Sequence, residues 1–172
     1  MHEKPPVSRQ IATGAVLLAV VALIALVGSQ ATIPNTTGWY AHVEKVPWNP
    51  PNWLFGPAWS ILYLLIALAG WLIWRAGWRA GKPNAARGAL VLFWVQLVLN
   101  AVWTPVFFAG YPVLGEAAWW GALAVIVALI ATVVALIVSA RKWSVAASAM
   151  LIPYVLWLLF ASTLNAGIIA LN

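Results

Sequence analysis

Five long apolar stretches constrain the fold of this chain more than any other feature of its sequence. They cover about residues 11–28, 53–74, 88–108, 117–140 and 145–170. An apolar helix of roughly 20 residues crosses a hydrocarbon core about 30 Å thick. Within these stretches the only ionisable side chains are Tyr63 and Tyr154, and charged residues make up 7% of the whole chain, against about 25% in soluble domains. The sequence therefore predicts an all-α integral membrane protein with a bundle of five transmembrane helices.

A polar tail, residues 1–10, precedes the first stretch, which leaves residues 11–172 as a single transmembrane domain. The tail and first stretch also resemble a signal peptide, with Ser29-Gln30-Ala31 as a small-residue cleavage site. The apolar run is longer than a usual signal core, so we favour a retained first helix. A loop of residues 32–52 follows, because Pro34, Gly38 and Pro47 interrupt any continuous helix.

The basic residues indicate how the bundle is oriented. With five helices, the N-terminus, the segment 75–87 and the turn at 141–142 share one side, and they hold every Lys and Arg except Lys45. Cytoplasmic segments of membrane proteins are enriched in Lys and Arg. We therefore expect a multi-pass protein of a bacterial cell membrane, with a cytoplasmic N-terminus and with the first loop and the C-terminus outside. The net charge of +6 reflects this topology, and no nucleic-acid binding is expected.

Several kinds of chemistry lack the residues that they need. The chain has no Cys and no Asp, its three Glu residues lie outside the predicted spans, and His42 is the one His beyond the tail. No metal site, no pair of catalytic carboxylates and no Ser-His-Asp arrangement is predicted. Ion-coupled transport is disfavoured as well, because it usually uses acids or histidines at membrane depth.

What remains is a stiff aromatic loop and a patch of amides. The loop ends in Trp48-Asn49-Pro50-Pro51, where two prolines fix the backbone in front of the second helix. Gln96 and Asn100 share one face of the third helix with Trp103. In hydrocarbon such amides turn into the bundle, where they bond to other helices or orient the polar edge of a ligand, and both roles stay open. We expect the loop to cover a pocket of Trp and Tyr rings, which suits a flat hydrophobic molecule.

Small residues at 124, 128, 131 and 135 form a stripe along the fourth predicted helix. Such a stripe lets a neighbouring helix approach closely. From the sequence, this neighbour belongs either to the same bundle or to a second subunit.

Five motifs occur in the following order: Trp39-Tyr40, Lys45-Val-Pro-Trp-Asn-Pro-Pro51, Trp59-Ser-Ile-Leu-Tyr63, Gln96-Leu-Val-Leu-Asn100-Ala-Val-Trp103-Thr-Pro105-Val-Phe-Phe108 and Pro153-Tyr-Val-Leu-Trp157. Together they resemble the tryptophan-rich sensory protein family, TspO, whose mitochondrial members are the translocator protein or peripheral benzodiazepine receptor. The resemblance covers about residues 11–172.

The resemblance implies a five-helix bundle, often dimeric, with the first loop folded over a pocket. It also implies binding of porphyrins such as protoporphyrin IX and haem, of benzodiazepine-type drugs and, in some members, of sterols. The family's ligand-contact positions match Trp39, Tyr40, Pro51, Trp59, Asn100, Trp157 and Ala161, and our candidate site adds Tyr63, Gln96, Trp103 and Tyr154. The sterol motif is incomplete, because no Lys or Arg follows Tyr154.

We therefore expect a membrane-embedded binding protein for porphyrin- or haem-type tetrapyrroles and similar flat lipophilic ligands, without a required cofactor. Its role would be sensory or regulatory, in stress or tetrapyrrole handling. One alternative is an enzyme that degrades porphyrin in light, for which Trp39 and Trp157 are the matching positions. Another is a transporter of porphyrins or other lipophiles, and a purely structural scaffold would bind no ligand saturably.

Overall fold

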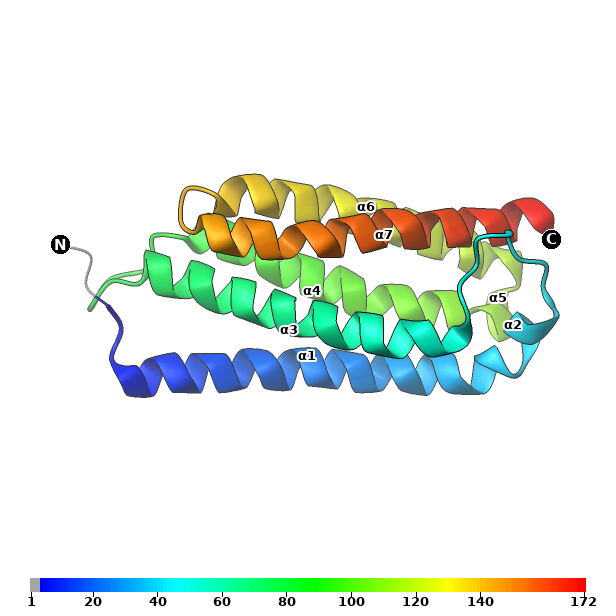
Figure 1. The fold of residues 1–172 in the computed structure, drawn as a ribbon, viewed down its shortest axis with the longest axis horizontal. Coiled ribbons are helices and arrows are strands. Elements are labelled where there is room, and N and C mark those ends of the chain that lie inside the picture. Colours follow the sequence, from blue (N-terminus) through cyan, green and yellow to red (C-terminus); the bar gives the residue numbers. More distant parts are fainter. Residues whose placement is uncertain (1–3) are drawn as a thin grey trace.

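The computed structural model describes residues 4–172, and Figure 1 shows them as an elongated bundle of helices. Five helices are long and apolar enough to cross a membrane: α1 (Val7–Thr36), α3 (Asn52–Gly77), α4 (Arg87–Phe108), α6 (Glu116–Ala140) and α7 (Val145–Leu171). Two short helices, α2 (Trp39–His42) and α5 (Tyr111–Leu114), lie at one end of the bundle. The described residues contain no strand. The prediction of an all-α bundle with five transmembrane helices is confirmed.

The first helix is longer than the predicted span of residues 11–28. It begins at Val7, inside the predicted polar tail, and continues through Pro34 to Thr36. The missing N–H of a proline removes one hydrogen bond from a helix, and here the proline falls in the last turn, where little helix remains to be disrupted. The first loop therefore starts after Thr36, and its predicted start at residue 32 is wrong.

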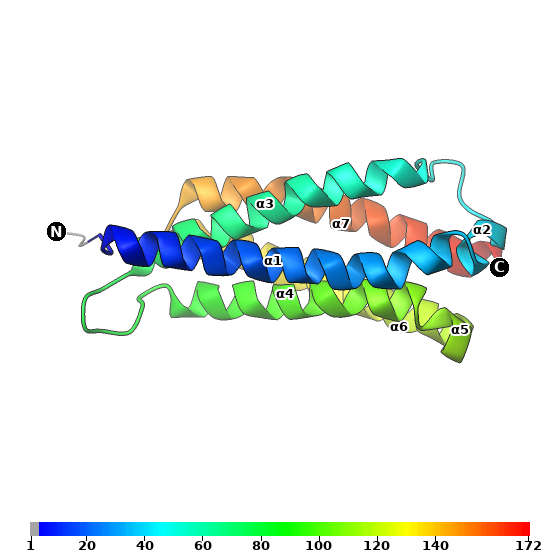
Figure 2. The same ribbon diagram turned by 90° about the horizontal axis from the view of Figure 1, so that it is seen from below.

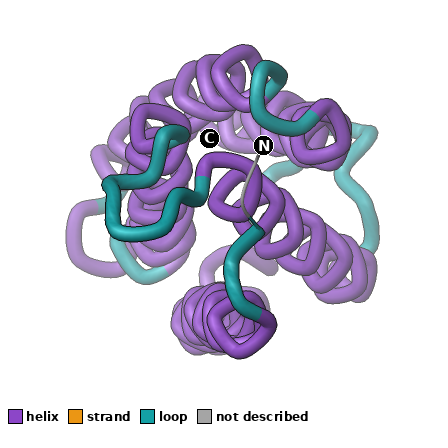
Figure 3. The backbone as a smooth tube through the Cα atoms, turned by 90° about the vertical axis from the view of Figure 1, so that its left-hand side faces the viewer, coloured by secondary structure: helices purple, strands orange, loops and turns teal. Residues whose placement is uncertain are grey.

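The spanning helices are packed unequally. α4 packs on α6, α6 on α7, and α7 on α3, while α1 lies against α3 and α4. Figure 2 shows α1 in front of these two helices, and the end-on view in Figure 3 places it at the rim of the bundle. α1 buries only Leu17, Val21 and Ile24, whereas α7 buries ten residues. α1 is thus the least enclosed of the five spanning helices.

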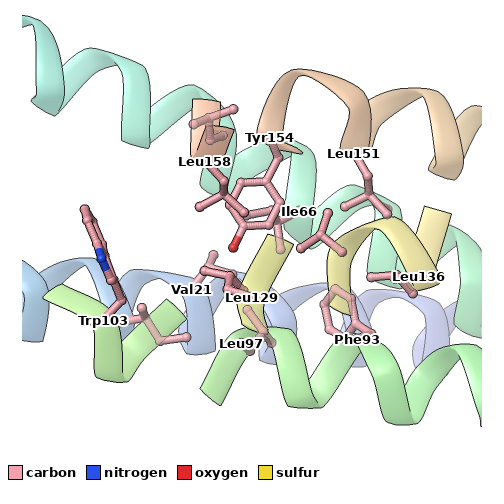
Figure 4. Close-up of a cluster of buried hydrophobic side chains, with 14 of the residues drawn as sticks. Val21, Ile66, Phe93, Leu97, Trp103, Leu129, Leu136, Leu151, Tyr154 and Leu158 are labelled. Carbon is pink, nitrogen blue, oxygen red and sulfur yellow. The ribbon is translucent and has the colours of Figure 1, made fainter. Parts of the chain in front are cut away.

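One half of the bundle, towards the N-terminus in Figure 1, is a closed apolar core. Figure 4 shows Phe93, Leu136 and Leu151 of α4, α6 and α7 meeting there, and each of the three is fully buried. Gly70 of α3 allows the ring of Phe93 to lie against its backbone, since a Cβ at position 70 would overlap that ring. The cavity described below lies in the other half.

The small-residue stripe of α6 lies on the outer surface. Ala124, Ala128, Ala131 and Ala135 are all exposed, while the buried face of this helix contains Ile126, Leu129 and Val133. Packing inside the bundle is therefore not the role of these four alanines. They are available to lipid or to a second copy of the chain.

The connecting segments divide between the two ends of the bundle. The start of α1, the 78–86 loop and the turn after α6 lie at one end, and α2, α5 and the C-terminus at the other (Figure 1). All described Lys and Arg residues except Lys45 therefore lie at or near the first end. Which end faces the cytoplasm stays a prediction from the positive-inside rule.

Candidate ligand-binding site

A cavity of about 830 Å³ lies among α1, α3, α4 and α7, in the half of the bundle near α2. Eight aromatic side chains contribute to its wall: Tyr40, Phe55, Trp59, Tyr63, Trp103, Phe107, Phe108 and Trp157. Small residues of α1 and α7, among them Ala25, Gly28 and Ala161, complete it. Large rings on one side and small residues on the other leave a broad apolar space.

Trp59 lies at the centre of the aromatic wall. Its ring centroid is 5.3 Å from that of Tyr63, one turn further along α3, and 6.5 Å from those of Trp103 on α4 and Trp157 on α7. These separations fall within the range of favourable aromatic pairs. Figure 4 shows Trp103 at the edge of the labelled core residues. Three helices are therefore joined at one ring cluster that faces the cavity.

Behind this wall a chain of hydrogen bonds links α3, α4 and α7. The Tyr63 hydroxyl donates to Asn100 Oδ1 at 2.9 Å, and Asn100 Nδ2 donates to the Tyr154 hydroxyl oxygen at 2.9 Å. Asn100 and Tyr154 are buried and do not line the cavity, whereas Tyr63 does. Of the two roles left open for Asn100, the structure shows interhelical bonding. Asn100 acts on the cavity wall through Tyr63, which lines the cavity, and through Tyr154, whose ring lies 6.3 Å from that of Trp59.

Other buried polar atoms have no hydrogen-bond partner in the part of the chain that the structure describes. Both amide atoms of Gln96 belong to this group, although its side chain is fully buried. So do the indole N–H groups of Trp103 and Trp157 and the Oδ1 atom of Asn165, three residues that line the cavity. A buried polar group without a partner costs about 1–3 kcal/mol. These residues of the cavity wall therefore hold hydrogen-bonding capacity that no protein group uses.

The short helix α2 closes one end of the cavity with Tyr40. Its hydroxyl donates to Asn49 Oδ1 at 3.2 Å. Burial raises the pKa of Tyr40 above its ordinary value, and the hydrogen bond to Asn49 partly offsets this effect. The ring of the neighbouring Trp39 lies 5.6 Å from that of Tyr40 but is directed towards α5: its Nε1 donates to the Phe108 carbonyl oxygen at 3.0 Å, and its ring packs 4.4 Å from that of Tyr111. Trp39 thus anchors α2 to the bundle and lies outside the cavity lining.

The loop between α2 and α3 is held to the end of α7. The Glu44 backbone N–H donates to Asn172 Oδ1 at 2.9 Å, and Asn172 Nδ2 donates to the Glu44 carbonyl oxygen at 3.1 Å. Val46 packs against Gly167, where a Cβ would overlap its side chain. Trp48 Nε1 adds a bond of 3.2 Å to Thr163 Oγ1. The loop lies over the bundle, as predicted, and α7 holds it there.

The structure brings together six of the eleven predicted site residues. The cavity is lined by Tyr40, Trp59, Tyr63, Trp103, Trp157 and Ala161. Pro51 lies in an adjoining recess instead. Trp39, Gln96, Asn100 and Tyr154 lie behind the wall.

Sequence reasoning missed the contribution of α1, which extends from Leu18 to Thr36 along the cavity. It also missed Phe55, Phe107 and the segment of α7 at Asn165 and Ile168. The small residues of α1 at 22, 25, 29 and 32 recur every three or four positions, with Gly28 beside them, and mark one helix face. That spacing was the available signal for the α1 wall.

Together these features define a class: a five-helix membrane protein with an aromatic cavity under a Trp- and Pro-rich loop. Comparison with known proteins makes the assignment specific, since the sequence profile of the TspO/MBR family matches residues 15–171. The chain belongs to this family. It is a multi-pass membrane protein, and its family membership supports a sensory or binding role in the membrane.

Similar proteins come from archaea, bacteria and animals. The tryptophan-rich protein TspO of Archaeoglobus fulgidus is 41% identical over 158 residues, which cover 91% of this chain and 94% of that protein. The tryptophan-rich sensory protein of Cereibacter sphaeroides is 34% identical over 151 residues, 81% of this chain and 84% of that protein. The human translocator protein is 33% identical over 139 residues, 81% and 78% of the two chains.

Proposed function

We propose that the cavity binds porphyrin-type tetrapyrroles and similar flat lipophilic molecules, and that the protein has a sensory or regulatory role. One observation carries this proposal, namely the aromatic cavity of about 830 Å³ around Trp59. Pockets for organic ligands of this kind have volumes of about 300–1,000 Å³, with mostly apolar walls and a few polar groups. The dimensions and the composition of the wall both meet that description.

The wall supplies two kinds of contact for such a ligand. A flat conjugated ring stacks on, or packs edge-on against, the rings of Trp59 and Trp157, contacts that are worth about 0.5–1.5 kcal/mol for each pair beyond the buried area. The unused indole N–H groups of Trp103 and Trp157 are donors for polar atoms at the ligand's edge after small side-chain adjustments. Burial of the apolar ring therefore supplies most of the affinity, ring stacking adds to it, and the indole donors add selectivity.

A second candidate function, passive transfer of the ligand, is favoured by the side of the cavity that faces lipid. Leu18 of α1 and Leu64 of α3 line the cavity and are 45% and 55% exposed. Lining residues that are this exposed favour an opening of the cavity to the outer surface between these two helices. Protein-dependent flux of porphyrin between liposomes would separate transfer from binding alone.

The binding proposal is tested by quenching of intrinsic Trp fluorescence with protoporphyrin IX, in detergent and in the dark. We expect saturable quenching by the wild-type protein and a half-saturation concentration raised at least tenfold in Trp59→Ala. Ala161→Phe, which fills the cavity, should weaken binding as well. Trp120→Ala is the matched control, because Trp120 is 58% exposed on α6 and does not line the cavity. Linear quenching, equal in all four proteins, would show that porphyrin merely partitions into the micelle and would contradict the proposal.

A further inference from the structure

A second recess, of about 490 Å³, adjoins the main cavity under the loop. Thr36, Tyr40 and Asn52 line both spaces, so Tyr40 stands at the boundary between them. The remaining residues of this polar recess are Ala41, Lys45, Asn49, Pro50 and Pro51. An apolar cavity therefore continues into a polar space at the end of the bundle that carries α2.

Lys45 gives the polar recess its charge. It is the one Lys or Arg of the sequence between Arg9 and Arg75, and it is partly buried. Its Nζ atom donates to the Val43 carbonyl oxygen at 3.1 Å and lies 4.8 Å from the ring centroid of Tyr40. An ammonium group has three donor hydrogens, so this bond to Val43 leaves donors for an anion. The cation–π contact with Tyr40 holds the ammonium beside the boundary with the main cavity.

The other groups around the polar recess favour an anion as well. Among residues 4–172, no acidic side chain lines it. Glu44, the nearest acid in the sequence, is exposed, and its backbone is bound to Asn172. The amide of Asn49 is fixed by two bonds, from the Tyr40 hydroxyl to its Oδ1 and from its Nδ2 to the Pro50 carbonyl oxygen. The recess is thus built around one cation whose neighbours are held in place.

We propose that the polar recess binds a carboxylate of the ligand whose apolar ring occupies the main cavity. This inference rests on the proposed function and narrows it to amphipathic, anionic ligands, such as a tetrapyrrole with carboxylate side chains. A carboxylate is costly in hydrocarbon, whereas next to Lys45 it gains a charge-assisted hydrogen bond. The recess therefore fixes the ligand's orientation, with the ring among the helices and the acid groups under the loop.

The test compares protoporphyrin IX, which carries two carboxylates, with its uncharged dimethyl ester, by quenching in the dark. We expect the wild-type protein to bind the acid about fivefold more tightly than the ester, as suits a charge-assisted contact at a partly exposed site. Lys45→Gln should lose this preference, because it should bind the acid more weakly and the ester as tightly as the wild type does. Lys45→Arg should retain the preference. Lys142→Gln is the matched control, because Lys142 also lies over an aromatic ring, 5.7 Å from the centroid of Trp143, but at the opposite end of the bundle.

Four other outcomes would overturn the inference. If Lys45→Gln weakens both porphyrins equally, Lys45 shapes the loop and does not bind the carboxylate. If Lys45→Gln leaves the affinity for both porphyrins unchanged, and both bind saturably, the recess has no part in binding and the proposed function stands. Saturable binding of neither porphyrin would overturn both proposals. If the wild type prefers the acid in detergent alone but loses this preference when phosphatidylglycerol is added in excess over the porphyrin, the recess belongs to a lipid headgroup.

Discussion

Replacing Asn100 by leucine separates a structural role of this residue from a ligand-binding role. Asn100 makes both side-chain bonds, each of 2.9 Å, to tyrosines of α3 and α7. Interhelical hydrogen bonds in membranes contribute about 0.6–2 kcal/mol each. In Asn100→Leu the Tyr154 hydroxyl, which is fully buried, also loses its partner, at about 1–3 kcal/mol. We expect a loss of about 3 kcal/mol in the free energy of unfolding, roughly a hundredfold in the unfolding equilibrium.

The assay is unfolding of the protein in mixed micelles by added sodium dodecyl sulfate, followed by far-UV circular dichroism. A triple variant, Tyr63→Phe, Asn100→Leu and Tyr154→Phe, removes every polar group of this hydrogen-bond network. It should recover most of the lost stability, because replacing all partners by apolar groups leaves no buried group unsatisfied. Protoporphyrin affinity should change less than threefold, since the ring of residue 63 remains against Trp59.

Two results would refute this reasoning. A triple variant no more stable than Asn100→Leu would show that the cost lies in packing and not in stranded hydroxyl groups. Loss of porphyrin binding by Asn100→Leu at unchanged stability would show that Asn100 contacts the ligand directly.

Three further predictions concern the loop and the cavity. Gly167→Ala should push Val46 away and make residues 43–51 several times more sensitive to protease, and Val46→Ala in the same chain should restore resistance. Burial raises the pKa of Tyr40 above about 10. The stability that its neutral hydroxyl contributes is therefore complete below pH 10 and is lost as the pH rises further. Between pH 9 and 11 the free energy of unfolding should fall less in Tyr40→Phe than in the wild type. If illuminated protoporphyrin is converted by the protein to a new absorbing product, Trp157→Phe should abolish the conversion more completely than Trp39→Phe, since only Trp157 lines the cavity, and equal loss in both would contradict this.

Sequence alone predicted the number and kind of the spanning helices because their signal is local. A charged side chain inside hydrocarbon is expensive wherever it lies, so the absence of charge over roughly 20 residues indicates a span without any knowledge of its neighbours. Helix ends carry weaker signals. Pro34 is compatible either with the start of a loop or with the last turn of a helix. In the structure it lies in the last turn of α1.

It was harder to predict which side chains face the bundle interior and which face lipid, because lipid and protein interior are chemically alike. On α6, Ile126 and Leu129 are buried while Val127 and Ala128 are exposed, although all four are apolar. The periodicity that reveals the buried face of a helix in water is therefore weak here. The small-residue stripe of α6 could not be assigned to the inside or the outside for this reason.

Aromatic residues of the candidate site were recognised as a group, but their individual directions were not. Trp39 and Tyr40 are adjacent on a short helix, so they must point to different sides, and nothing local determines which of them enters the cavity. The partners of Asn100 were equally out of reach, since Tyr63 and Tyr154 are 37 and 54 residues away along the chain. Such pairings depend on how distant helices dock.

The weak enclosure of α1 has a consequence for the range of molecules that the protein can accept. In water, a helix displaced from its bundle would expose apolar surface, at about 25 cal/mol for each Å². In a bilayer, acyl chains replace the lost contacts, so this penalty largely disappears. With only three buried side chains, α1 is expected to act as an adjustable wall, and α3, α4 and α7 to hold the rings in fixed positions. We expect affinity to depend steeply on a ligand's ring system, which contacts α3, α4 and α7. It should depend only weakly on the size of the ligand groups that face α1.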